Sequence, residues 1–340
     1  MTIPGVWSGA EQGYRQMSDQ RQCDTQAAKL RVGISACLLG APVRFDGGHK
    51  RDRFIDEQLG RFFEFVPACP EMAIGLGTPR QPIRLVAAEG GVRAVGSRDA
   101  TLDVTGRLQE YAREAASNSG DLCGYIFKKD SPSCGMQRVR VYDTGGVPRR
   151  DGTGLFAEAI MRDRPLLPVE EEGRLNDPVL RENFINRVFV YARWRKLLAD
   201  GLSKAGLVAF HADHKLLIMA HSTDGYRQLG RLVGNLQARP LPDIADEYIA
   251  TLMQVLGRRS SRKRHANVLQ HLLGYLRKCA DPRDRRDLLD AIEAYRRGDY
   301  PLVVPVRLLH HQFLRHPHPY VSRQVYLAPY PEALMLRNAV

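Results

Sequence analysis

The stretch LRVGISACLLG, residues 30–40, decides the fold that we expect for this chain. Its first seven residues form a short apolar segment with β-branched side chains, which is typical of a buried strand. A cysteine follows at once, in a loop that contains a glycine. The same arrangement recurs at Cys69 and at Cys134, each of which comes after another apolar segment. Further strands are predicted at 63–68, 122–128 and 166–169. Segments with helical spacing lie between them, at 51–63, 108–117 and 155–162. Strands that alternate with helices predict an α/β domain with a parallel sheet.

The domain organisation follows from changes in pattern along the 340 residues, a length that predicts two domains. Residues 1–29 are polar and lack periodicity, so we interpret them as a mobile extension. A hairpin is predicted around Glu89–Gly91, inside the α/β domain. After the run Glu170–Glu172, helical patterns dominate as far as about residue 294. The boundaries that we predict are 30–172 for the α/β domain and 173–340 for a mainly α-helical domain.

Composition excludes several classes of protein. The chain is 44% hydrophobic and 26% charged, which excludes a wholly disordered or collagen-like protein. No apolar run approaches the roughly 20 residues that span a bilayer, so no membrane association is expected. The start of the chain has neither a basic segment nor an apolar core of the kind found in secretory signals. We therefore expect a cytoplasmic protein.

Charge is divided unevenly between the two halves. Residues 1–175 hold 24 Lys and Arg against 23 Asp and Glu, whereas residues 176–340 hold 26 against 15. The net charges are thus +1 and +11, and nine of the ten histidines also lie in the second half. Because nearly all of the excess lies in one half, we predict that the helical domain binds a polyanion.

Cys37, Cys69 and Cys134 are the candidate ligands of a metal centre. Each follows a predicted parallel strand, and the carboxyl edge of such a sheet is where ligands bind, so we expect the three to converge. Thiolates select zinc or iron–sulfur clusters, but no Cys-x-x-Cys pair typical of structural zinc is present. Spacing alone leaves iron, zinc and a redox thiol open. The remaining cysteines, Cys23, Cys123 and Cys279, are interpreted as non-ligands.

The motifs SACLLG, VRFDGG, PACPE and SPSCG together resemble those of the TudS-type thiouracil desulfidase family, over about residues 30–165. This resemblance implies a Rossmann-like domain with a 4Fe–4S cluster on Cys37, Cys69 and Cys134. It implies that one iron of the cluster has no protein ligand and takes sulfur from a thionucleobase. It also implies that the reaction requires a glutamate and a serine. The glutamate corresponds to Glu71, and the serine to Ser131 or Ser133. Phe45 stands at a position where an aromatic residue, often Tyr, is expected, and we assign it no role.

The densest basic segment of the helical half supplies the candidate RNA-binding residues, which are Arg258, Arg259, Arg262, Lys263, Arg264 and His265. A basic helix of this kind grips phosphates and offers polar groups to bases or sugars. A second cluster, His211, His214 and His221, has spacing that could bind metal, but buried helix histidines or RNA contacts are favoured.

The second half also resembles the YbgA-type helical domain, over about residues 190–337. The matching segments include VAFHADHKLLIMAHS, RHANVLQHLLGYL and YLAPYPEALMLRN. Chains that join this domain to a TudS-like domain are similar to desulfidases that act on 4-thiouridine in tRNA, so the resemblance implies tRNA as the partner. No obligate protein partner is inferred.

The leading hypothesis is therefore an iron–sulfur desulfidase of tRNA 4-thiouridine, which would yield uridine and hydrosulfide. One alternative is a desulfidase of free thiouracil or thionucleosides, in which the basic domain serves assembly. The other is a non-catalytic RNA-binding redox sensor whose cysteines hold zinc or a cluster.

Overall fold

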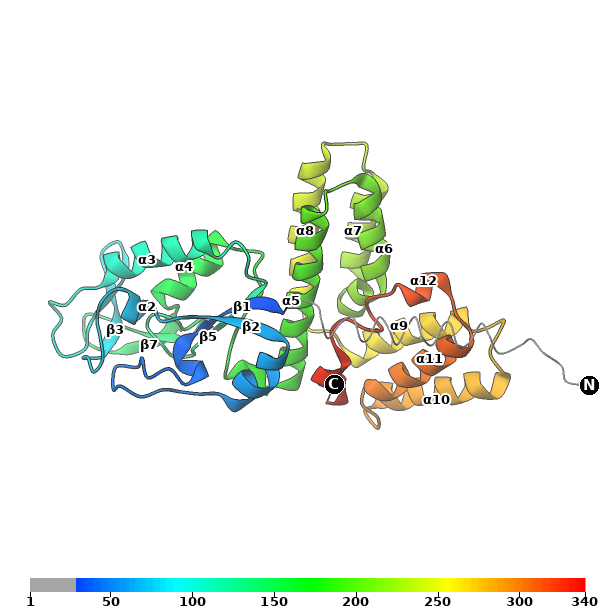
Figure 1. The fold of residues 1–340 in the computed structure, drawn as a ribbon, viewed down its shortest axis with the longest axis horizontal. Coiled ribbons are helices and arrows are strands. Elements are labelled where there is room, and N and C mark those ends of the chain that lie inside the picture. The colour runs from blue at the N-terminus through cyan, green and yellow to red at the C-terminus, as the bar shows by residue number, and fades with distance from the viewer. Residues whose placement is uncertain (1–28, 340) are drawn as a thin grey trace, which may run out of the picture. The chain divides into compact units, whose positions relative to one another are not determined.

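The chain forms two compact units in the computed structural model, which describes residues 29–339. One unit runs from Lys29 to Phe184 and the other from Ile185 onward. The predicted extension at 1–29 and Cys23 lie outside the described residues, except for Lys29 itself. The first unit combines strands and helices, and the second is mainly helical, which confirms the predicted fold class (Figure 1).

A parallel four-stranded sheet forms the centre of the first unit, with strand order β2-β1-β5-β8. Its strands are β1 (Leu30–Ser35), β2 (Phe63–Ala68), β5 (Gly124–Phe127) and β8 (Val169–Glu171). β1 is buried over most of its length and β5 throughout, as their apolar sequences predict. Helices α3 (Thr105–Asn118) and α4 (Leu155–Asp163) pack side by side against this sheet (Figure 1).

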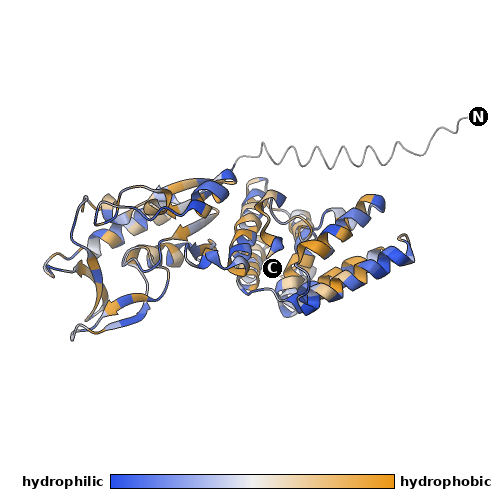
Figure 2. Ribbon diagram, turned by 90° about the horizontal axis from the view of Figure 1, so that it is seen from below, coloured by the Kyte–Doolittle hydropathy of each residue, from blue (hydrophilic) through white to orange (hydrophobic). Residues whose placement is uncertain are grey.

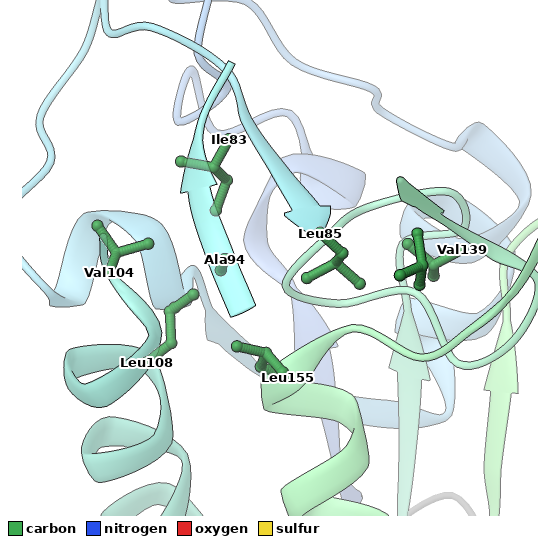
Figure 3. Close-up of a cluster of buried hydrophobic side chains, with 8 residues drawn as sticks. Ile83, Leu85, Ala94, Val104, Leu108, Val139 and Leu155 are labelled. Carbon is green, nitrogen blue, oxygen red and sulfur yellow. The ribbon is translucent and has the colours of Figure 1, made fainter. Parts of the chain in front are cut away.

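A second four-stranded sheet, of mixed direction, has the order β4-β3-β6-β7. Its strands are β3 (Ile83–Ala88), β4 (Gly91–Gly96), β6 (Val139–Tyr142) and β7 (Pro148–Gly152). β3 and β4 form the predicted hairpin. Leu85 and Ala94 from this hairpin, Val104 and Leu108 from the α3 region and Leu155 from α4 belong to one buried cluster (Figure 3). This core fixes α3 and the start of α4, and the start of α4 contacts the loop that carries Cys134.

The second unit is built of helices. Their bounds are α5 (Pro178–Ala199), α6 (Lys204–His221), α7 (Thr223–Gly234), α8 (Leu241–Gly257), α9 (Arg262–Tyr275), α10 (Pro282–Arg297), α11 (Val303–Arg315) and α12 (Pro319–Ser322). α6, α7 and α8 pack against one another, and α9, α10 and α11 form a second group that contacts the first through α6 and α9. Several helices carry hydrophobic and hydrophilic residues on different sides (Figure 2). Within residues 29–339, none of the helices has the length and apolar character needed to cross a bilayer.

Three local details differ from the sequence-based expectations. The helix expected at 51–63 is a π-helical turn, Phe54–Gln58, followed by a 3-10 turn, Leu59–Arg61, which together still bury Ile55 and Leu59. β6 and β7 were not predicted. The division between the two units lies inside α5, after Phe184, and Arg181 of α5 lies over the Phe54 ring of the first unit, 4.1 Å from its centroid.

Candidate functional site

The three candidate ligands lie at the carboxyl ends of three neighbouring strands. Cys37 is in the 3-10 turn Ala36–Leu39 after β1, Cys69 follows β2 directly, and Cys134 lies in the loop after β5. β1 pairs with both β2 and β5, and Ser35 lies opposite Ala68 in the register. Cys37 and Cys69 therefore leave adjacent strands at nearly the same level.

The three thiols form one electrostatic group. Burial raises the pKa of the Cys37 thiol to about 11, while nearby Lys128 opposes the shift and Cys69 adds to it. Burial also raises the pKa of Cys69 and that of Cys134. Electrostatic repulsion from Cys69 and Cys37 adds to the rise at Cys134. Reactive cysteines have lowered pKa values. These buried thiols show the opposite shift, which is unlike that of an exposed nucleophile.

Three thiols are a donor set of the kind that zinc and iron–sulfur clusters prefer. Across residues 29–339, no three His, Cys, Asp or Glu side chains are arranged so that they could hold one metal ion. Among the other described cysteines, Cys123 is buried in the strand region and Cys279 is exposed in the second unit.

Glu71 is held in place by two partners next to Cys69. It lies in the first turn of the short helix α2 (Pro70–Ala73), and its side chain is only 15% exposed. The Ser133 hydroxyl donates to Glu71 Oε1 at 2.9 Å, and Arg80 donates to Oε2 from Nε at 3.0 Å and from Nη2 at 2.8 Å. Both carboxylate oxygens therefore have a fixed orientation, which a group that handles a proton requires.

The two candidate serines have different contacts. Ser131 Oγ accepts hydrogen bonds from the backbone N–H groups of Ser133 and Cys134, so it shapes the loop. Ser133 is fully buried, and its hydroxyl reaches Glu71 across 62 positions of sequence. The structure thus distinguishes a loop-shaping serine from one that touches the carboxylate, which the motif alone could not do.

Arg80 is the residue of this site that sequence reasoning missed. Its guanidinium also donates to Gly77 O at 2.7 Å and to Val43 O at 3.0 Å, and its backbone N–H donates to Phe45 O at 2.8 Å. The side chain is 6% exposed. Arg80 thereby ties Glu71 to the loop that contains Phe45. A single arginine after Thr78–Pro79 carries no sequence signal that could have identified it.

Glu170–Glu172, which marked the domain boundary in the sequence, belong to the site region. All three side chains are buried. Glu171 accepts from the backbone of Met136 at 2.8 Å, and Glu172 accepts from Lys128 Nζ at 2.6 Å and from the backbone of Lys129. The acidic run therefore clamps the loops that follow β5. In sequence, a run of charged residues predicts a solvated linker. The role of these glutamates in holding the loops after β5 is visible only from their hydrogen bonds to residues distant in sequence.

The loop after Cys37 forms the more exposed side of the region. Arg44 forms an ion pair with Asp46 at 3.6 Å, and its guanidinium lies 5.4 Å from the centroid of the half-exposed Phe45 ring. Arg44 and Lys128 both favour the charged form of Cys37. Both cations are also paired with carboxylates, Arg44 with Asp46 and Lys128 with Glu172.

The basic segment of the second unit is only partly at the surface. Ser261 caps α9 by accepting from the Arg264 N–H, which places the following basic residues in the first turn. Arg258, Arg259 and Lys263 are exposed, and Arg264 is intermediate. Arg262 is exposed but is also engaged, because it donates to Tyr295 O and Tyr300 O, both at 3.1 Å, and lies over the Tyr295 ring.

His265 differs from its neighbours because it is buried, with 3% of its surface exposed. Its Nδ1 contacts the Tyr326 hydroxyl at 2.9 Å and its Nε2 contacts Ser260 Oγ at 2.8 Å. Both ring nitrogens are thus used inside the protein. The imidazole is therefore not available to RNA, which corrects its inclusion in the predicted RNA-binding set.

The three histidines of α6 are buried side chains with internal partners. Nδ1 of His211 contacts the Tyr248 hydroxyl at 3.1 Å, that of His214 contacts Phe210 O at 2.7 Å, and that of His221 contacts Arg258 O at 2.7 Å. Burial lowers the pKa values of all three, to about 4, 3 and 4 respectively. They stabilise the helical packing as neutral rings, in agreement with the preferred interpretation of the sequence.

Comparisons with known proteins divide the chain in the same way. The family described as 2-thiouracil desulfurase matches residues 32–172, and the family described as protein of unknown function DUF1722 matches residues 215–331. The uncharacterized protein YbgA of Escherichia coli K12 is 32% identical over 154 residues, which cover 45% of this chain and 91% of YbgA. The uncharacterized protein YbbK of Bacillus subtilis 168 is 30% identical over 154 residues, 42% of this chain and 97% of YbbK.

A solved structure is also similar over part of the chain. It is described as the [4Fe-4S]-dependent thiouracil desulfidase TudS, and it is 32% identical with a TM-score of 0.35. The match covers 44% of this chain and 95% of TudS. With its strand-end cysteines in the first unit and a YbgA-like second unit, the chain belongs to the 2-thiouracil desulfurase family and carries a C-terminal DUF1722 domain.

Proposed function

We propose that this chain is a desulfidase that removes sulfur from 4-thiouridine in tRNA and releases uridine and hydrosulfide. The observation that carries the proposal is the carboxylate of Glu71, which is fixed by Ser133 and Arg80 between the loops of Cys69 and Cys134. Membership of the 2-thiouracil desulfurase family supports the class of reaction. The uneven charge of the chain supports a polyanionic substrate.

The proposed cofactor is a 4Fe–4S cluster held by Cys37, Cys69 and Cys134. When bound, it would have one iron without a protein ligand, which would act as a Lewis acid toward a soft thiocarbonyl sulfur. The three thiols must lose their protons to bind a cluster, so cluster binding would release protons.

The chain's own residues then provide the proton chemistry. Water adds to the carbon that carries sulfur, the C–S bond breaks, and the products are the oxo base, hydrosulfide and one proton. Glu71 orients this water and accepts its proton, because its carboxylate lies two residues from Cys69. Arg80 holds one oxygen in place and balances the charge, while Ser133 fixes the other oxygen.

The proposed tRNA-binding surface consists of the exposed basic residues at the start of α9, with Arg259 and Lys263 at its centre. A free thiobase has no phosphate and no need for a domain with an excess of eleven positive charges. A tRNA offers a folded polyphosphate, and its target base must leave its neighbours before its sulfur can react.

The test compares substrates on the anaerobically purified full chain. We expect hydrosulfide release from tRNA that contains 4-thiouridine to exceed release from the nucleoside and from 2-thiouracil. Glu71→Gln, which keeps the shape but loses the basic oxygen, serves as the inactive control. Equal turnover of the free base would favour the alternative that the family name suggests. A metal-bound protein without turnover on any substrate would favour the redox sensor.

The RNA surface has its own test. Arg259→Gln with Lys263→Gln should weaken tRNA binding and reduce the log–log salt slope by about one for each phosphate that is no longer neutralised. Arg149→Gln with Arg150→Gln removes the same charge from β7 in the first unit and is the matched control. Equal weakening by both pairs would show that net charge, and not this surface, governs binding.

A further inference from the structure

Tyr125 of β5 lies in a group of aromatic side chains in the first unit. Its ring stacks on Phe127 with centroids 4.3 Å apart and meets Phe156 of α4 edge-on at 6.0 Å. A Cβ at position 33 would overlap the Tyr125 ring, so the glycine of β1 makes room for it. The ring therefore has a fixed position, and its place in the packing is explained by apolar contacts alone.

The hydroxyl of Tyr125 is not explained by that packing. The residue is 3% exposed, and its oxygen has no hydrogen-bond partner among the residues that the structure describes. A buried polar group without a partner is costly, and a phenylalanine would fill the same space without that cost. Phe127, two residues along the same strand, is such a residue.

The surroundings of this hydroxyl indicate its partner. Phe156, which the Tyr125 ring meets edge-on, donates its backbone N–H to Ser133 O at 3.0 Å, so the ring packs against the helix start that holds the loop of Cys134. The electrostatic neighbours of the Tyr125 side chain, Cys134, Tyr111 and Cys69, agree with this position. Two of these three neighbours are proposed ligands of the cluster. Sulfur atoms of iron–sulfur clusters accept hydrogen bonds, and such bonds help to set the reduction potential.

We propose that Tyr125 is a positioning residue whose hydroxyl donates a hydrogen bond to a sulfur atom of the iron–sulfur cluster or of its cysteine ligands. The inference rests on the proposed function, because it requires the cluster on Cys37, Cys69 and Cys134. A donor at sulfur stabilises the more negatively charged, reduced form of the cluster. Its loss should therefore make the cluster harder to reduce.

The first experiment uses Tyr125→Phe, which removes only the hydroxyl. In the anaerobically reconstituted full chain, the reduction midpoint, followed by electron paramagnetic resonance, should shift to a more negative potential at unchanged iron content. Tyr111→Phe is the matched control, because this half-buried tyrosine also interacts electrostatically with Cys69 and Cys134 but has access to water. An unchanged midpoint in Tyr125→Phe, or a larger shift in Tyr111→Phe, would overturn the assignment.

The second experiment separates this inference from the proposed function. In protein freed of iron, Tyr125→Phe should not lower the melting temperature, since the hydroxyl has no partner there among the described residues. In the cluster-bound protein the same change should lower it. A drop in the iron-free protein would reveal a protein partner and reject the inference, even if the cluster and the desulfidase activity were established. A wild-type protein that binds no cluster would reject both proposals.

Discussion

The ion pair between Arg80 and Glu71 should dominate the stability of the first unit around its site. Arg80→Gln leaves the Glu71 carboxylate without its positive partner, although that side chain is only 15% exposed. Loss of one partner of a buried pair costs about 3–5 kcal/mol. Because Glu71 keeps some contact with water, we expect the lower end, about 3 kcal/mol. At about 2–4 °C for each kcal/mol, the unfolding transition of this unit should fall by about 6–12 °C.

A double-mutant cycle distinguishes the charge pair from the other interactions of Arg80. Glu71→Gln in the Arg80→Gln background removes the unpaired charge, so the double variant should be more stable than the sum of the single changes predicts. We expect a coupling free energy of about 2 kcal/mol. The hydrogen bonds from Arg80 to Gly77 O and Val43 O are absent whenever Arg80 is replaced, with or without Glu71, and therefore cancel.

Differential scanning calorimetry of iron-free protein is the assay, since it can resolve the transitions of the two units. Arg93→Gln is the control, because it breaks the more exposed ion pair with Asp103 in the same unit and should cost no more than about 1 kcal/mol. Additivity of the two single changes within about 0.5 kcal/mol would refute the reasoning. It would mean that Arg80 acts through its carbonyl hydrogen bonds alone.

Two further predictions concern the cofactor and the helical unit. Cys69→Ser should lose most of its iron on anaerobic reconstitution while Cys279→Ser retains it, as measured by iron and sulfide content; full iron in the first variant would remove Cys69 from the ligand set. The helical unit should lose stability as pH falls from about 6.5 toward 4, because the unfolded chain takes up protons on His211, His214 and His221 while burial holds their folded pKa values at about 4, 3 and 4. Urea unfolding followed by circular dichroism should show a slope approaching about 1.4 kcal/mol per pH unit for each histidine, and none above pH 7. A midpoint that does not change across this range would contradict the assignment.

Local sequence was sufficient for the elements that carry the cysteines. β1, β2 and β5 are short apolar segments whose character does not depend on distant partners, and their strand ends place Cys37 and Cys69 at one edge. The division into an α/β part and a basic helical part is likewise a property of composition and periodicity. These features follow from residues close in sequence.

Only the tertiary structure decided which polar side chains meet. The hydrogen bond from Ser133 to Glu71 joins residues 62 positions apart, and the choice between Ser133 and Ser131 depends on it. Burial of His265 depends on Tyr326, which is 61 positions away, and its basic neighbours predicted a surface position instead. The buried role of Glu170–Glu172 comes from partners brought by β5 and its following loop. Charged and polar residues look alike in sequence whether they face water or a distant partner, because their pattern records no long-range pairing.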